Sequence, residues 1–481
     1  MTDAIQHYDN FIDGRFVPAP GAERISVINP ATEAPISTAP ESPADTVRVA
    51  LDAAARAQPA WGNVPAIRRA RALRDIATRI RASADDLARV ITKEQGKTLA
   101  LSKIEVMFTA DYLDYMAEWA RRIEGEILNS DRERENIFMF RMPIGVIAGI
   151  LPWNFPFFLV ARKLAPALVT GNTIVIKPSE ETPNNAFEFA KIIAETDLPA
   201  GVANFVSGRG PTVGQELAAS PVADMVSFTG SVETGSAIMR AAAANITKVN
   251  LELGGKAPAL VLADADVDLA IRAIVASRVI NSGQVCNCAE RVYVDGAVAD
   301  EFTDKLTAAM VKTRWGDPMV EEDIDMGPLI NEAGFEKVDR LVNGAIAEGA
   351  SLVTGGKRGE SATGHYYEPT VLADCRQDME IIRREVFGPV VPVVKFDDLD
   401  QAIAYANDSD YGLTSSIYTS NIAVAMRACN EIRFGETYIN RENFEAMQGF
   451  HAGCRKSGIG GADGKHGLYE YTQSHMVYVQ Y

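Results

Sequence analysis

The sequence predicts an α/β fold with a parallel sheet, spread over two or three domains. Residues 172–262 alternate β-branched runs with helical patterns, as expected where crossover helices connect parallel strands. The chain of 481 residues exceeds the size of one ordinary hydrophobic core. Its 47% hydrophobic and 23% charged residues are typical of a globular, soluble protein.

The N-terminal region predicts a small ribbon followed by helices. Asp13-Gly14 lies between two short apolar runs and is a hairpin signal. Ser42 is expected to cap a helix, with Pro43 at its first position and Asp45 in its first turn. Further helices are predicted over about 66–81, 83–94 and 98–124.

A long apolar tract follows at residues 142–160. Pro143, Pro152, Asn154 and Pro156 interrupt it, so it would make a poor membrane span. We expect a buried strand and loop here, and no membrane partner.

Residues 172–262 contain the alternating elements that define the sheet. Strands are expected at 173–176, 203–206, 225–228 and 248–253, with helices at 184–194, 212–219 and 232–243. Nucleotides bind where the strands of such a sheet end. The turn 228–231 leads from a strand into a helix, and its amides can hold a pyrophosphate or simply form a tight turn. Lys177 and Glu180 follow another strand and can grip the hydroxyls of an adenosine ribose.

The loop 281–288 lies between a predicted helix at 264–280 and a predicted strand at 291–295. It carries Cys286, the best candidate for a nucleophile. A thiol has a pKa of about 8.5 and needs an adjacent base or cation to react well. Glu252, in an apolar strand before two glycines, is the best candidate for that base, and burial is expected to raise its pKa.

Plainer interpretations compete with this hypothesis. A cysteine in a large chain is usually a small inert hydrophobic residue, and a glutamate before Gly-Gly is often only a turn residue. Cys288 adds a second thiol, which can join Cys286 in a strained disulfide or form half of a metal site. No histidine is spaced with these cysteines as a zinc site requires, so no metal is expected.

Charge and cysteine content limit the partners and the compartment. The net charge of −17 argues against nucleic acid and anionic membranes, which both require a basic surface. Five scattered cysteines do not form a secreted disulfide framework, and the N-terminus shows no secretory signal. We therefore expect a cytoplasmic protein.

Two strands far apart in the sequence are expected at residues 137–141 and 476–481. They can pair into an outlying ribbon, and exposed strand edges favour pairing with a second subunit. A homo-oligomer, either a tetramer or a dimer, is therefore expected.

Together the motifs resemble the aldehyde dehydrogenase superfamily over the whole chain. The motifs that carry the resemblance are Pro152-Trp-Asn154-Phe-Pro156, Lys177-Pro-Ser-Glu180, Phe228-Thr-Gly-Ser231, Leu251-Glu252-Leu-Gly-Gly-Lys256, Gly283-Gln-Val-Cys286, Glu385-Val-Phe387-Gly-Pro389 and Lys456-Ser-Gly-Ile-Gly460. The resemblance implies three parts, which are a Rossmann-type NAD-binding domain (1–124 and 143–251), an α/β catalytic domain (252–465) and an oligomerisation ribbon (125–142 and 466–481).

The resemblance also implies a mechanism. Cys286 would add to an aldehyde and form a thioester, with the oxyanion held by Asn154 and the Cys286 backbone N–H. Glu252 would activate water for hydrolysis, and its presence implies that water rather than coenzyme A accepts the acyl group. NAD is expected in preference to NADP, because Glu180 repels a 2′-phosphate. The implied cofactor-binding residues are Trp153, Lys177, Glu180, Phe228, Gly230, Ser231, Glu385 and Phe387.

Within the superfamily the chain is most similar to bacterial lactaldehyde and glycolaldehyde dehydrogenases, which implies a small hydroxyaldehyde as substrate. The implied substrate-binding residues are Arg162, Asn287, Glu445 and His451. The alternatives are succinate-semialdehyde dehydrogenase, whose usual arginine is replaced here by Ile280, and a broad-specificity aldehyde dehydrogenase. Cys454 replaces a large aromatic residue of the lactaldehyde enzymes, which predicts a more open pocket wall.

Overall fold

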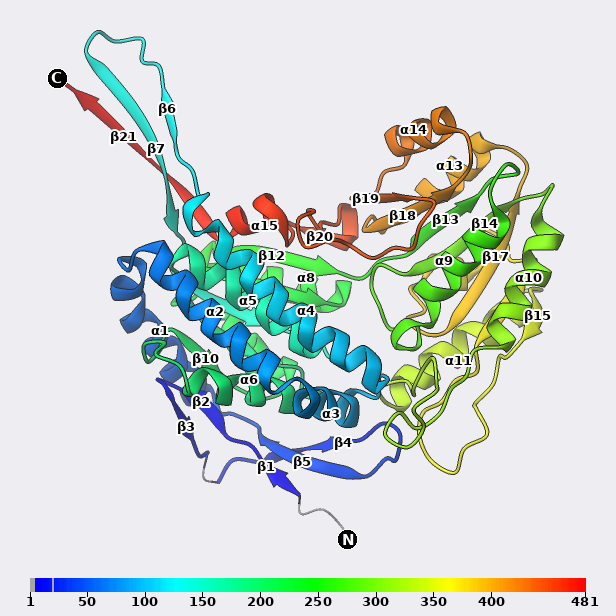
Figure 1. Ribbon diagram of the computed structural model, residues 1–481, viewed down its shortest axis with the longest axis horizontal. Coiled ribbons are helices and arrows are strands. Elements are labelled where there is room, and N and C mark those ends of the chain that lie inside the picture. The colour runs from blue at the N-terminus through cyan, green and yellow to red at the C-terminus, as the bar shows by residue number, and fades with distance from the viewer. Residues whose placement is uncertain (1–4, 20) are drawn as a thin grey trace.

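The computed structural model describes residues 5–19 and 21–481, which form two α/β units and a projecting ribbon (Figure 1). The chain passes directly from one unit to the other, because only residues 254–256 separate β12 (Lys248–Leu253) from β13 (Ala257–Val261). The predicted α/β fold is confirmed, with a largely parallel sheet in each unit.

The first unit is built on an eight-stranded sheet. Its strands, in spatial order, are β20 (Gly458–Ile459), β12, β11 (Met225–Gly230), β8 (Val146–Ile150), β9 (Thr173–Lys177), β10 (Ala203–Phe205), β2 (Asn10–Ile12) and β3 (Arg15–Val17). The run from β12 to β10 is parallel. β2 and β3 form the predicted hairpin at the edge.

Helices cover both faces of this sheet. Successive residues of a strand point to opposite faces, so each buried strand supplies apolar side chains to both helix layers. Ile174 and Ile176 of β9 belong to one hydrophobic cluster, and Val175 between them belongs to another. The helices on the first face are α2 (Ala66–Ala82), α3 (Ala84–Gln95), α4 (Leu99–Glu118), α5 (Pro156–Thr170) and α6 (Asn184–Ala194). Those on the second face are α1 (Ala44–Gly62), α7 (Gln215–Ala219) and α8 (Val232–Ala242).

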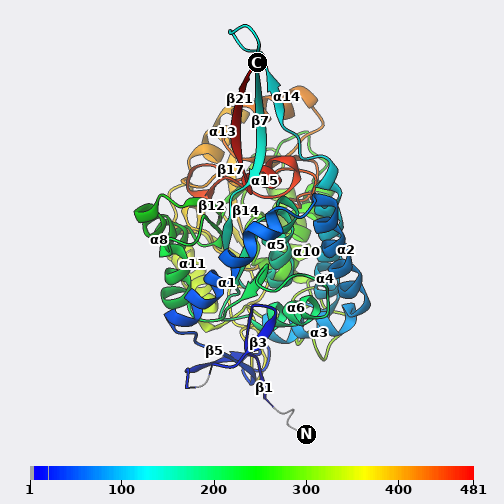
Figure 2. The same ribbon diagram turned by 90° about the vertical axis from the view of Figure 1, so that its left-hand side faces the viewer.

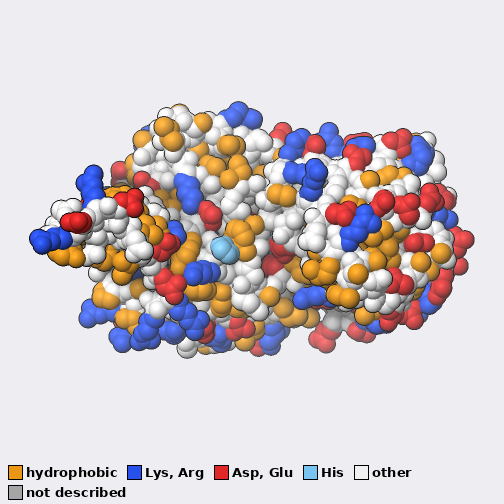
Figure 3. All heavy atoms as spheres, turned by 90° about the horizontal axis from the view of Figure 1, so that it is seen from above, with side chains coloured by type: hydrophobic (Ala, Val, Ile, Leu, Met, Phe, Trp, Pro, Cys, Tyr) orange, Lys and Arg blue, Asp and Glu red, His pale blue; other side chains and the backbone are white. Residues whose placement is uncertain are grey.

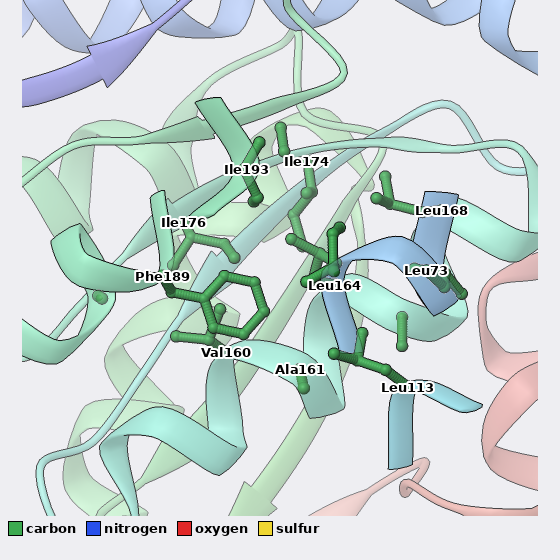
Figure 4. Close-up of a cluster of buried hydrophobic side chains, with 14 of the residues drawn as sticks. Leu73, Leu113, Val160, Ala161, Leu164, Leu168, Ile174, Ile176, Phe189 and Ile193 are labelled. Carbon is green, nitrogen blue, oxygen red and sulfur yellow. The ribbon is translucent and has the colours of Figure 1, made fainter. Parts of the chain in front are cut away.

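Helix α5 is buried along its whole length. Its apolar side chains meet β9 on one side and helices α2, α4 and α6 around it (Figure 4). The expectation of strand and loop alone over 142–160 was therefore wrong beyond residue 155. Pro156 fits the first turn of a helix, where its missing N–H is not needed, and full burial removes the amphipathic pattern that would have revealed the helix.

The second unit contains a seven-stranded sheet. Its strands, in spatial order, are β15 (Ser351–Thr354), β16 (Thr370–Ala373), β17 (Val390–Phe396), β14 (Ala289–Asp295), β13, β18 (Thr414–Tyr418) and β19 (Glu436–Ile439). All neighbours are parallel except β15 and β16. Its helices are α9 (Val267–Val279), α10 (Ala299–Val311), α11 (Glu332–Ala347), α12 (Glu380–Arg383), α13 (Leu399–Asn407) and α14 (Ile422–Glu431).

Several helix boundaries differ from the predictions. The Ser42 hydroxyl does not cap α1; it accepts a hydrogen bond from Asn10 Nδ2 at 2.8 Å, and Pro43 is the N-cap. α4 stops before residue 124, and a 3₁₀ turn, Trp119–Arg121, follows it. The helix predicted at 212–219 is α-helical only in α7, after a π-helical turn at Gly210–Gly214.

The ribbon consists of β6 (Glu126–Leu128), β7 (Glu135–Pro143) and β21 (Thr472–Gln480). β21 pairs antiparallel with β7 along its full length, which confirms the predicted pairing of distant strands. The ribbon projects from the end opposite the small N-terminal sheet (Figure 2). That sheet contains β1 (Gln6–His7), β5 (Pro35–Pro40) and β4 (Arg24–Ile28).

The surface seen from above carries Lys, Arg, Asp and Glu side chains intermixed, and hydrophobic side chains show on the projecting ribbon (Figure 3). The exposed hydrophobic residues of the ribbon are Ile127, Leu128, Phe140, Met142, Met476, Tyr478 and Val479. Within residues 5–19 and 21–481, every helix is too short or too polar to span a bilayer.

Candidate functional site

A cavity of about 580 Å³ lies between the two units. The first unit contributes residues that follow β8 and the ends of β11 and β12. The second unit contributes residues that precede β14 and β17 and residues that follow β19. Ligands bind in folds of this kind at the carboxyl edge of the parallel sheet. The predicted site residues that line the cavity are Trp153, Asn154, Arg162, Gly230, Ser231, Glu252, Cys286, Asn287, Glu385, Phe387, Glu445 and His451.

The turn before Cys286 is held in an unusual backbone conformation. Asn281, Ser282 and Gly283 are left-handed in succession, with φ of 48°, 57° and 75°. A Cβ on Gly283 would collide with the Gly388 carbonyl oxygen. The Ser282 hydroxyl donates to a backbone carbonyl at 2.7 Å and helps to hold the turn. Such strain costs about 1–3 kcal/mol per residue and persists only where surrounding structure enforces it. The result is a half-buried Cys286 on the cavity wall.

Asn154 joins the same wall from the end of β8. Its Nδ2 donates to the Gln284 carbonyl at 3.0 Å, which uses one of the two amide hydrogens. Its own backbone carbonyl accepts a hydrogen bond from Asn281 Nδ2 at 3.1 Å. The second amide hydrogen has no acceptor among the described residues, so it can meet negative charge that forms in the cavity.

Glu252 lies at the end of β12 and is buried. Its Oε1 pairs with the Lys163 ammonium, and its Oε2 lies 3.7 Å from Arg162 Nη1. Burial alone raises the pKa of this carboxyl, but Lys163, Arg162 and His451 outweigh it and lower the pKa to about 2. The expectation of a raised pKa was wrong, because these neighbouring cations are contributed by segments distant in the sequence.

A polar wall beside Cys286 is formed by Arg162, Asn287, Glu445 and His451. Asn287 Nδ2 donates to Glu445, and Glu445 Oε1 lies 3.4 Å from Arg162 Nη2. Asn287 Oδ1 is buried and has no hydrogen-bond donor among the described residues. A buried acceptor without a partner is costly, so this atom marks a place where a ligand hydroxyl can bind.

His451 lines the same cavity as Cys286. Its Nδ1 lies 2.6 Å from Glu436 Oε1. Burial lowers the pKa of the imidazole, but Glu445, Cys286 and Glu436 outweigh it and raise that pKa well above the usual value.

Asp463 belongs to this network and was not predicted from the sequence. Arg162 Nε donates to its Oδ1 at 3.1 Å, and Arg162 Nη2 donates to its Oδ2. Asp463 has a left-handed φ of 68° and is buried. The dipeptide Asp463-Gly464 is typical of an exposed turn, so the sequence carries no signal for this role. Lys163 likewise had no role predicted from the sequence.

Two cofactor candidates lie away from the cavity wall, at the end of β9. Lys177 Nζ lies 2.9 Å from Glu180 Oε2, and Gly210 N–H donates to Glu180 Oε1 at 3.2 Å. Ser231 caps α8 by accepting a hydrogen bond from Thr234 N–H at 3.2 Å. Phe228 differs from the other candidates, because its side chain is buried in the hydrophobic core beneath Gly230 and presents no surface to a ligand.

Glu385 and Phe387 approach the cavity from the second unit. Glu385 Oε1 accepts a hydrogen bond from Gly255 N–H at 3.0 Å, and burial raises the pKa of this carboxyl to about 7. Phe387 has a left-handed φ of 57°, and its ring lies 5.6 Å from that of Trp153. The buried Glu290 carboxylate holds this segment by accepting the Phe387 N–H at 3.1 Å.

The other cysteines do not share the position of Cys286. All five thiols are free, and Cys288 is buried with its pKa raised to about 12, chiefly by burial. Cys454 lies outside the cavity lining, with its Sγ 3.3 Å from the Gly412 carbonyl oxygen. Among the described residues no group of three or more His, Cys, Asp or Glu is arranged for a metal ion.

Comparisons with known proteins agree with this geometry. The profile described as "Aldehyde dehydrogenase family" matches residues 16–477. Lactaldehyde dehydrogenase of Escherichia coli (strain K12) is 62% identical over 480 residues, which cover 100% of both chains. A crystal structure of lactaldehyde dehydrogenase from Escherichia coli has a TM-score of 0.98 at 61% identity and covers 99% of this chain and 100% of that chain. Betaine aldehyde dehydrogenase from Staphylococcus aureus, solved in complex with NAD+, has a TM-score of 0.96 at 35% identity, covering 98% and 95% of the two chains.

Proposed function

The chain belongs to the aldehyde dehydrogenase family, and we propose that it oxidises a small hydroxyaldehyde, such as lactaldehyde or glycolaldehyde, to the carboxylic acid with NAD. The observation that carries this proposal is the wall around Cys286, where Asn154 and Glu252 meet the polar side chains beside Asn287. The full-length similarity to lactaldehyde dehydrogenase supports a hydroxyaldehyde over a dicarboxylic semialdehyde.

In the proposed reaction the Cys286 thiolate attacks the aldehyde carbon, and the carbonyl oxygen gains negative charge. The free amide hydrogen of Asn154 and the Cys286 backbone N–H receive that charge. Preorganised donors of this type contribute about 3 kcal/mol each in the transition state.

The residues that were predicted to bind the cofactor suit a dinucleotide. Ser231 opens α8, whose first-turn amides suit a phosphate, and Lys177 with Glu180 offers a cation and a carboxylate to a ribose. Glu385, Phe387 and Trp153 would contact the nicotinamide half. Thr229 lines the cavity, and its buried Oγ1 lacks a hydrogen-bond partner within the described chain, as expected where a ligand supplies one. The chemistry that bound NAD supplies is acceptance of a hydride from the carbon held by Cys286.

Glu252 completes the reaction by accepting a proton from the water that attacks the thioester, and the Cys286 sulfur leaves as thiolate. The Lys163 contact keeps this carboxylate ionised. Its Oε2 lies 3.7 Å from Arg162 Nη1 but accepts no hydrogen bond within the described chain, so it keeps lone pairs for a proton from water. The products are the free acid and the regenerated thiolate.

The substrate hydroxyl is assigned to Asn287 Oδ1, the acceptor that otherwise lacks a donor among the described residues. Arg162, Glu445 and His451 complete the polar end of the pocket. Steady-state kinetics with L-lactaldehyde, glycolaldehyde, succinate semialdehyde and propanal test this assignment. We expect the highest kcat/KM for the hydroxyaldehydes; a preference for succinate semialdehyde or propanal would contradict it.

The preference for NAD is expected to depend on Glu180. Its carboxylate lies next to Lys177 and would repel the 2′-phosphate of NADP. In Glu180→Ala we expect kcat/KM for NADP to rise by about tenfold or more, equivalent to about 1.4 kcal/mol. KM for the aldehyde serves as the control and should stay constant. An unchanged NADP/NAD ratio would contradict the assignment.

We also propose the domain division expected from the sequence, with an NAD-binding domain at 1–124 and 143–251, a catalytic domain at 252–465 and a ribbon at 125–142 and 466–481. The two sheets and the ribbon support this division. β20 and the last two residues of β12 are exceptions, because they lie within 252–465 but belong to the first sheet. The five free thiols support a reducing, cytoplasmic location.

The ribbon is proposed to join subunits into a tetramer or a dimer. Ile127 and Tyr478 on the ribbon are 77% and 62% exposed. Contact with a partner subunit would remove this apolar surface from water, which is favourable. We expect Ile127→Asp with Tyr478→Asp to lower the molar mass measured by light scattering after size exclusion. Ile246→Asp, at a 92% exposed position outside the ribbon, is the matched control and should leave the mass unchanged. An unchanged mass in the double variant would exclude the ribbon as the interface.

A further inference from the structure

A fully buried ion pair lies directly beneath Asn154. Lys97 Nζ and Glu105 Oε2 are 2.6 Å apart, and neither side chain is exposed to solvent. Lys97 comes from the turn between α3 and α4, and Glu105 from the second turn of α4. Nothing in the proposed reaction uses either charge.

Both partners hold the segment that carries Asn154. Lys97 Nζ donates to the Asn154 backbone carbonyl at 2.7 Å and lies 3.7 Å from the centre of the Phe155 ring. Glu105 Oε1 accepts the N–H groups of Phe157 and Phe158 at 2.9 and 3.1 Å. The pair therefore holds the Asn154 carbonyl on one side and the first turn of α5 on the other.

The turn that supplies Lys97 is itself fixed between the two units. Gly96 is left-handed with a φ of 88°, and a Cβ there would lie 2.8 Å from Pro30 and 2.9 Å from Pro328. The Asn154 carbonyl also accepts from Asn281, the first left-handed residue before Cys286. Lys97 and the cysteine loop thus share one acceptor, which couples the position of Asn154 to that of Cys286.

Stability alone does not account for the pair. Removing two charges from water is expensive, and well-packed hydrophobic side chains of similar volume usually stabilise a protein at least as well. An ammonium with one carboxylate and one carbonyl as acceptors instead specifies where that carbonyl lies. This is what an oxyanion-binding amide requires, since a displacement of about 1 Å can cost up to about 10²-fold in rate.

We propose that Lys97 and Glu105 form a positioning unit that aligns the Asn154 amide for the oxyanion formed at Cys286. This inference rests on the proposed function. Neither residue touches the reacting atoms; Lys97 acts through the Asn154 backbone and Glu105 through Lys97 and the start of α5. The effect should therefore fall on formation of the thioester and not on binding of the dinucleotide.

The test is a double-mutant cycle on the pre-steady-state burst of NADH. The neutral pair Lys97→Met with Glu105→Gln avoids a lone buried charge and keeps an acceptor for α5. We expect the burst rate to fall by about 10- to 100-fold, with unchanged Kd for NAD. In an Asn154→Ala background the same pair should slow the burst by no more than about twofold, because the residue that it positions is gone.

Glu94 is the matched control. It is also a buried glutamate that accepts two helix N-terminal amides, those of Asn184 and Asn185 at 2.8 Å each, but at α6 and away from the cavity. Glu94→Gln should lower the Tm without slowing the burst. If the neutral pair does not fold, Lys97→Arg keeps the ion pair and alters only the geometry at Asn154. It should then cause a smaller loss that again disappears in Asn154→Ala.

The outcomes separate the two proposals. The neutral pair could slow the burst equally with Asn154 present and in Asn154→Ala, or Glu94→Gln could slow it as much as the neutral pair does. Either result would show a general packing effect and overturn the positioning role. An unchanged burst in Asn154→Ala alone would instead remove the oxyanion assignment and count against the proposed mechanism. If the neutral pair slows the burst when Asn154 is present but not in Asn154→Ala, the inference is supported.

Discussion

Replacing Cys286 with Ala is expected to abolish aldehyde-dependent NAD reduction, with a fall in kcat of about 10⁵-fold or more. Cys286 is the half-buried thiol on the cavity wall, which it shares with Asn154 and His451. Without its sulfur no thiohemiacetal forms, and the later steps have no covalent intermediate to act on. NADH absorbance at saturating aldehyde and NAD measures the loss.

Two controls keep this result specific. NAD binding, followed by quenching of tryptophan fluorescence, should keep its Kd, because the substitution leaves the residues assigned to the dinucleotide in place. Cys429→Ala removes another free thiol, on α14 and outside the cavity, and should retain activity. Measurable turnover in Cys286→Ala with any aldehyde of the panel would eliminate the mechanism.

Glu252→Gln is expected to stop the reaction at the thioester. Gln keeps the shape of the side chain but cannot accept a proton from water, so hydrolysis should slow by about 10²- to 10⁴-fold. The first turnover does not use this base, and a burst of NADH close to one per subunit should precede the slow phase. Rapid-mix absorbance records the burst, and intact-protein mass spectrometry detects the acylated enzyme.

The Lys163 contact gives a further check on Glu252. The substitution leaves the buried ammonium with a neutral partner, so the Tm should fall even where the burst is intact. Hydroxylamine, a nucleophile that needs no base from the protein, should release the acyl group and restore turnover. Full steady-state turnover without a burst would contradict the role of Glu252 in deacylation.

Helices and strands whose hydrophobic residues recur at regular spacing were predictable from the sequence. The parallel strands β9, β11 and β12 and helix α6 lie where alternation and helical spacing placed them. Helix α5 was missed beyond residue 155, because it is buried on all sides and has no polar face to create a period. The cap of α1 was misassigned, because the Ser42 hydroxyl bonds to Asn10 from a strand far away in the chain.

Most predicted site residues line one cavity, but Lys177 and Glu180 lie away from it at the end of β9, and Phe228 lies in the core. Phe228 belongs to a motif of the turn, but alternation along β11 directs its side chain into the core. Asp463 and Lys97 had no local signal, because one resembles a turn residue and the other a surface lysine. Their importance comes from burial against charges supplied by other segments.

The sequence by itself determined the chemical groups of this protein, namely a loop thiol, a strand carboxylate and glycine turns at strand ends, because these depend on residue type and short spacing. Only the tertiary structure decided how those groups behave. Glu252 has a pKa near 2 instead of a raised one, because Lys163 and Arg162 lie beside it. Electrostatic interactions depend on distance in space and on burial, and neither can be read from separation along the chain.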